Sequence, residues 1–99
     1  MDYRDYNYKL YQTNNNCKYM FEDYDSQLFD LDLDYDLVYA GSVRCGDKSD
    51  LGGVAELLYM IWNSDQRPAS KTARSMSVSD VVEIEGKRFY CNDIGFKEL

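Results

Sequence analysis

The 99-residue chain has no histidine, a single proline and no apolar run long enough to cross a bilayer. Without histidine, Ser-His and Cys-His nucleophile pairs and most catalytic zinc sites are excluded. Gly52-Gly53 lacks the spacing of a phosphate-binding loop. Cys17, Cys45 and Cys91 form no C-x-x-C pair, so neither a disulfide framework nor a zinc site is indicated. We expect reduced thiols in or near the core of a cytoplasmic protein that is not an enzyme and binds no cofactor.

Basic residues are also scarce, with 11 against 18 acids, a net charge of −7 and an isoelectric point near 4.4. Phosphate backbones and anionic membranes repel such a protein, so we expect it to bind neither nucleic acid nor membrane directly. A basic protein is the natural complement, and nucleic-acid enzymes commonly have large basic surfaces. In the alternative interpretation the charge serves only solubility.

Tyrosine is abundant: ten Tyr accompany four Phe and one Trp. Its apolar ring and polar tip suit both half-exposed sheet faces and interfaces. Polar and apolar residues alternate from Asp5 to Gln12, which predicts a strand with one buried face. An Asn-rich turn at 13–16 follows, and Cys17–Phe21 resumes as a second strand, so residues 5–21 are predicted to form a hairpin.

Residues 22–36 form the most biased part of the chain, which we call the acidic segment. From Phe29 to Leu37 apolar residues alternate with aspartates, which predicts a strand with a ladder of carboxylates roughly 6.5–7 Å apart. A competing interpretation places a helical turn at Ser26–Phe29, capped by Asp25 or Ser26, and starts the strand near Tyr35. Both make Tyr35–Val43 a strand. The acids are Glu22, Asp23, Asp25, Asp30, Asp32, Asp34 and Asp36.

The aspartates at 30, 32 and 34 resemble the opening of a calcium loop. The sixth position of that loop requires glycine and here is Tyr35, and the twelfth requires an acid and here is Gly41. We therefore expect no metal site.

Residues 51–62 show helical spacing, with Asp50 placed to cap the first turn. Leu51, Val54, Ala55, Leu58, Ile61 and Trp62 form one apolar stripe. Leu57, Tyr59 and Met60 lie off that stripe, so the helix is either wrapped on two sides or has an exposed apolar patch.

The last quarter of the chain predicts a hairpin. Val81, Val82 and Ile84 favour a strand, Glu85-Gly86 a turn, and Phe89–Cys91 a second strand. The element order then predicts an α+β fold, in which one amphipathic helix packs on a mainly antiparallel sheet of about five strands that ends in a C-terminal hairpin. We see one domain, residues 1–99.

The segment Ser-Met-Ser-Val-Ser-Asp-Val-Val at 75–82, together with Phe-Tyr-Cys-Asn-Asp-Ile-Gly-Phe-Lys-Glu-Leu at 89–99, resembles the C-terminal signature of the YodL-like domain. The resemblance continues more weakly through Tyr35–Gly41 and the helix at 51–62. Bacterial mobile elements and phages carry this small domain. The resemblance therefore implies a setting in mobile DNA inside a bacterium, where small proteins often act on host defences, and it implies no catalytic residue.

Two functions compete. In the first, the acidic segment with Tyr24 and Tyr35 fills the basic groove of a host defence enzyme, such as a CRISPR effector or a restriction nuclease, by nucleic-acid mimicry. This would make the chain an anti-CRISPR or antirestriction inhibitor. In the second, the chain is a protein–protein adaptor or scaffold that uses Leu57, Tyr59 and Met60 or the edge of the final hairpin. Homo-oligomerisation through that edge belongs to the second class.

Overall fold

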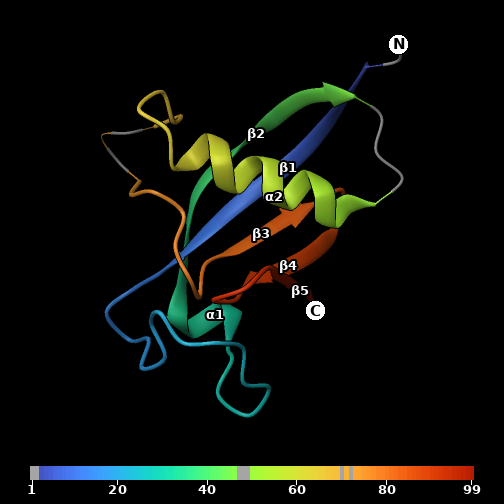
Figure 1. Cartoon of the computed structure of the whole chain (residues 1–99). Helices are drawn as coiled ribbons and strands as arrows, with labels where there is room; N and C mark the ends of the chain where they lie inside the picture. Colours follow the sequence, from blue (N-terminus) through green and yellow to red (C-terminus); the bar gives the residue numbers. More distant parts are fainter. Residues whose placement is uncertain (1–2, 47–49, 70, 72) are drawn as a thin grey trace.

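A computed structural model describes residues 3–46, 50–69, 71 and 73–99. Five antiparallel strands form one sheet in the order β2-β1-β3-β4-β5, and one long helix lies across it (Figure 1). This confirms the predicted α+β architecture and the C-terminal hairpin. The elements are β1 (Tyr3–Thr13), α1 (Leu31–Asp34), β2 (Tyr35–Gly46), α2 (Leu51–Trp62), β3 (Val81–Ile84), β4 (Lys87–Cys91) and β5 (Phe96–Glu98).

The main core lies between the sheet and α2. Tyr6, Tyr8 and Leu10 alternate along β1 and are buried, as the period of two predicts. Asp50 caps α2 as expected, because its side chain accepts the N–H of Gly52. The buried stripe of α2 ends at Trp62, whose Nε1 donates to the Tyr8 hydroxyl at 3.1 Å. The remaining buried members of this core are Cys45, Val54, Ala55, Leu58, Ala73, Met76, Val82, Ile84 and Phe89.

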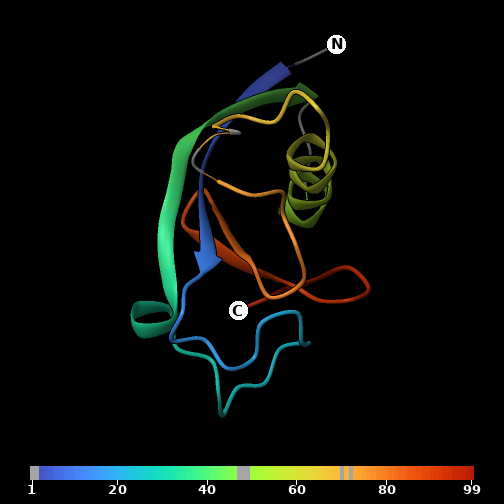
Figure 2. The same cartoon turned by 90° about the vertical axis from the view of Figure 1, so that its left-hand side faces the viewer.

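A smaller aromatic cluster lies on the opposite face of the sheet, because neighbouring residues of a strand point to opposite faces. Val82 joins the main core, whereas Val81 packs with Tyr19, Tyr35 and Tyr90. The polypeptide between β1 and β2 covers this cluster, and Figure 2 shows it running beneath the end of the sheet.

The predicted hairpin over residues 5–21 is wrong. β1 pairs instead with β2, with Tyr8 opposite Gly41, and its other edge pairs with β3. Both edges of β1 are therefore occupied, so Cys17–Phe21 remains outside the sheet and buries Tyr19 in the aromatic cluster.

The predicted aspartate ladder is also wrong. Asp30 caps the short helix α1, since its Oδ1 accepts the N–H groups of Asp32 and Leu33 at 3.1 Å each. The strand begins at Tyr35, as in the competing interpretation. That interpretation also placed a turn near 26–29, where the N–H groups of Leu28 and Phe29 donate to the Asp25 carbonyl.

The final hairpin turns at Glu85 and Gly86, which have φ of 49° and 84°. Positive φ at both central residues is the requirement of a type I′ turn, and this turn suits the twist of the flanking strands.

Candidate protein-binding surface

The acidic segment holds the whole net charge of the molecule. It contains seven acids and no base, whereas the rest of the chain has eleven acids and eleven bases. Six of the seven acidic residues are exposed and Asp34 is half-buried. The negative potential is therefore concentrated in fifteen residues at one end of the sheet.

Ion pairs among the described residues all lie outside this segment. Arg44 pairs with Asp5, and Arg88 pairs with Glu83. The other pairs are Arg4–Glu85, Lys9–Glu83 and Arg74–Asp80. Within the described ranges no cation is paired with any of the seven carboxylates, so their charge is left to solvent or to a partner.

Hydrogen bonds fix the start of the segment to the turn between β4 and β5. The Asp23 carboxylate accepts the backbone N–H of Asp93 at 2.7 Å, and the Tyr24 N–H donates to Oδ1 of Asn92 at 2.8 Å. The Tyr90 hydroxyl donates to the Glu22 carbonyl at 2.7 Å. These three bonds hold the first acids in place before any partner arrives.

Both tyrosines of the predicted site face inward. Tyr35 is only 5% exposed, and its hydroxyl donates to the Ser79 carbonyl at 2.6 Å. Burial raises the pKa of Tyr35. Tyr24 is half-buried, with its ring edge-on to Tyr90 at 5.3 Å between centroids. They support the acidic segment from beneath, and Tyr35 has no surface on which a partner could rest.

Exposed apolar side chains accompany the acids, and sequence reasoning missed them. Phe21 is 61% exposed with a left-handed φ of 68°, and Leu33 is 65% exposed on α1. The predicted aspartate ladder had placed Leu33 on its inward face, whereas the strand predicted at Cys17–Phe21 assigned no face to Phe21. No pattern in the sequence marks either side chain as exposed. Leu28 and Leu37 are exposed as well. The surface is thus acidic and partly apolar.

A model of the YodL-like domain matches residues 7–99. The chain belongs to this family. No curated protein and no solved structure matched the sequence.

The alternative surface on α2 of this YodL-like domain is partly present. Leu57 is half-buried and packs against the main core, so only part of its side chain is open to a partner. Met60 is 70% exposed, and Tyr59 stacks edge-on against Phe96 with ring centroids 6.4 Å apart. A hollow of about 370 Å³ lies here, between α2 and the β4–β5 turn; we call it the helix hollow. Its lining residues are Glu56, Tyr59, Met60, Cys91, Asn92, Asp93, Gly95 and Phe96.

The predicted edge of the final hairpin is not free on β4. β5 pairs along it, with Tyr90 opposite Lys97. The outer edge is therefore the three-residue strand β5. Short edge strands limit the addition of further strands, so this edge is a weak site for self-association.

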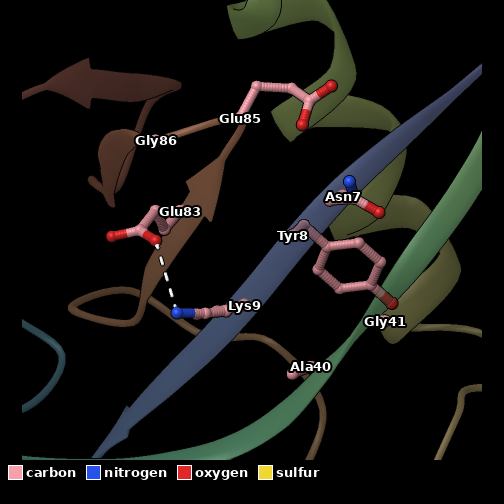
Figure 3. Close-up of a pocket in the computed structure, with 8 residues that line it drawn as sticks. All are labelled: Asn7, Tyr8, Lys9, Ala40, Gly41, Glu83, Glu85 and Gly86. Carbon is pink, nitrogen blue, oxygen red and sulfur yellow. Dashed lines mark ion pairs between the residues drawn. The ribbon is translucent and has the colours of Figure 1, made fainter.

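A second hollow of about 290 Å³ lies on the sheet face away from the main core (Figure 3). Nζ of Lys9 forms an ion pair with Oε2 of Glu83 in this hollow at 4.0 Å. Oε1 of Glu83 also pairs with Nε of Arg88 at 3.0 Å. Glu85 pairs with Arg4 at 3.2 Å. Its charged residues are already compensated, so it has little to attract a charged ligand.

The cysteines of the YodL-like domain are free thiols, as expected, with Cys45 and Cys91 buried and Cys17 half-buried. Burial raises the pKa of Cys91 to about 12, so this thiol stays protonated at neutral pH and is a poor nucleophile. In the parts of the chain that the structure describes, no cluster of Cys, Asp or Glu is arranged to hold a metal ion, and no helix is long and apolar enough to span a membrane.

Proposed function

We propose that this YodL-like domain is a non-enzymatic binding protein whose acidic segment occupies the nucleic-acid groove of a basic host protein. One observation carries the proposal: the entire net charge of −7 lies in residues 22–36, and no described cation neutralises it. Carboxylates can take phosphate positions because both accept paired hydrogen bonds from arginine. The uncompensated charge also speeds the encounter with a cationic surface.

The target class follows from the mobile-element setting that the family resemblance implies. A mobile element benefits from inhibiting the host enzymes that destroy foreign nucleic acid, such as CRISPR effectors and restriction nucleases. These enzymes bind nucleic acid in basic grooves, so they are the proposed targets. The inhibitor would act in the bacterial cytoplasm. Because the segment bends through α1 instead of extending as a strand, mimicry would depend on irregularly spaced carboxylates and not on a regular ladder.

The experiment uses acids whose side chains are exposed and cap no helix. Asp32→Asn with Asp36→Asn removes two charges from the acidic segment, and Asp65→Asn with Glu98→Gln removes two exposed charges elsewhere. Purified CRISPR effectors and restriction nucleases are assayed for cleavage and for association rate at low and moderate salt. We expect the first pair to slow association several-fold and the control pair to have little effect. Equal inhibition by both double variants, or no inhibition of any nuclease by the wild type, would contradict the proposal.

The exposed Met60 beside the helix hollow favours a second candidate, a protein–protein adaptor that binds through apolar contacts. Salt separates the two functions, because screening weakens contacts between exposed charges and leaves apolar contacts largely intact. A partner lost from an affinity column at moderate salt supports the groove-blocking function, and a partner retained supports the adaptor.

A further inference from the structure

We propose that the helix hollow takes an apolar side chain from a basic segment of the partner that the acidic segment attracts. The inference rests on the proposed function for the charge of that partner. It adds a second contact site with a defined ligand chemistry: one leucine- or phenylalanine-sized side chain flanked by lysine or arginine.

The lining of the helix hollow sets the apolar part of this requirement. The Tyr59 and Phe96 rings meet edge-on, and Met60 extends beside them with 70% of its surface exposed. Ile94, which is 90% exposed, stands on the adjoining turn. Methionine adapts to irregular shapes, so such a surface can close around an aliphatic or an aromatic side chain.

The rim sets the charge of the ligand. Glu56 and Asp93 line the helix hollow, both are exposed, and neither takes part in an ion pair among the described residues. No basic residue lines it. An acidic ligand would be repelled, and so would a second copy of this chain with its own charge of −7. Lysine or arginine beside the apolar anchor would be attracted.

The helix hollow adjoins the start of the acidic segment. Asn92 and Asp93 line the helix hollow, and the same two residues bond to Tyr24 and Asp23 of the acidic segment. One partner chain could therefore contact Asp23 and the helix hollow together. The charges would speed the encounter, and the buried side chain would supply most of the lifetime of the complex.

The turn that forms one wall is held in shape before binding. The Asn92 N–H donates to the Gly95 carbonyl at 3.0 Å, and Gly95 has a left-handed φ of 74°, which glycine adopts without strain. The Asn92–Gly95 bond closes the turn on itself, and the two bonds to the acidic segment fix Asn92 and Asp93 in place. A preformed wall lowers the ordering cost of binding.

Two synthetic peptides test the proposal without knowledge of the natural partner. Each is a short lysine- and arginine-rich peptide, one with a central leucine and the other with serine at that place. Binding to the full chain is measured by calorimetry, and the backbone amides that respond are located by NMR. We expect the leucine peptide to bind about tenfold more tightly or better, since burying a leucine side chain is worth about 1.5–3 kcal/mol. Binding of the leucine peptide should change the backbone amide chemical shifts of residues 59, 60 and 94–96.

Variants of two exposed residues identify the contact. Met60→Ser should remove most of the advantage of the leucine peptide. Tyr3→Ser, a matched loss of an apolar side chain that is 64% exposed in β1, should leave it intact. Ile94→Ser serves as an independent second variant, and circular dichroism checks that each variant is folded.

The outcomes separate this inference from the function on which it rests. If both peptides bind equally and shift only residues 22–36, the helix hollow is not a binding site and the acidic segment still is. If neither peptide shifts either region, both proposals are overturned. If the wild type forms a dimer that Met60→Ser abolishes, the occupant is a second copy and the inference is wrong.

Discussion

Asp80 is the buried acid whose titration should be visible in the stability of the fold. Its side chain is fully buried and accepts hydrogen bonds from Nη2 of Arg74 at 3.0 Å, Nε2 of Gln12 at 3.1 Å and the N–H of Ser77 at 2.9 Å. Burial nevertheless outweighs these partners and raises the pKa of Asp80 from 3.8 to about 6. Arg74 also donates to Thr13, so this network joins the end of β1 to the segment that precedes β3.

The sign of the effect follows from the direction of the shift. Between pH 3.8 and about 6 the folded protein keeps a proton on Asp80 that the unfolded chain has released. The resulting stability is fully present below pH 3.8 and is lost as the pH rises through about 6. Two pKa units correspond to about 3 kcal/mol in total, of which roughly half is lost between about pH 5 and about pH 7.5.

Urea unfolding followed by Trp62 fluorescence can measure this loss. The wild type, Asp80→Asn and the exposed control Asp65→Asn are compared at about pH 5 and about pH 7.5, both above the isoelectric point near 4.4. Asparagine does not titrate, so the stability of the wild type relative to Asp80→Asn should be higher at the lower pH than at the higher pH, by roughly 1 kcal/mol. Asp65→Asn should keep the pH slope of the wild type. Parallel profiles for the wild type and Asp80→Asn would mean that Arg74 keeps Asp80 ionised, and the reasoning from burial would fail.

Three further expectations concern the fold. Trp62→Ala should lower the free energy of unfolding by about 3–5 kcal/mol, because the ring is fully buried and donates to Tyr8; a near-neutral result in urea unfolding would place the ring outside the core. Truncation before Gly86 removes β4 and β5, so circular dichroism should show no cooperative thermal transition, and a cooperative one would show that the final hairpin is dispensable. Gly86→Ala should lower the free energy of unfolding in urea by roughly 1–2 kcal/mol, because alanine is strained at the φ of 84°. Gly46→Ala is the control: an added Cβ meets open space at both glycines, but Gly46 has no positive φ, so its replacement should change the stability little. Equal losses of stability in the two variants would rule out backbone strain.

Local sequence patterns were sufficient to predict the elements that are set by residues close together in the chain. The 3.6-residue stripe from Leu51 to Trp62, the cap at Asp50 and the turn at Glu85-Gly86 are each set by residues a few positions apart, and all appear where expected. The acidic composition of residues 22–36 was equally clear, since acidic and basic residues can be counted without knowing the fold.

Only the tertiary structure decided which strands pair and which side chains face outward. The alternation of apolar residues and aspartates around Asp32 fits a strand. In the folded chain Asp30 instead caps α1 and accepts two backbone N–H groups there. β1 has β2 and β3 on its two sides, so no further strand can pair with it. The same packing buries Tyr35 and exposes Met60 at the helix hollow. Strand pairing joins residues distant in sequence, and its free energy comes from surfaces that exist only after the chain has folded, so no short window of sequence contains it.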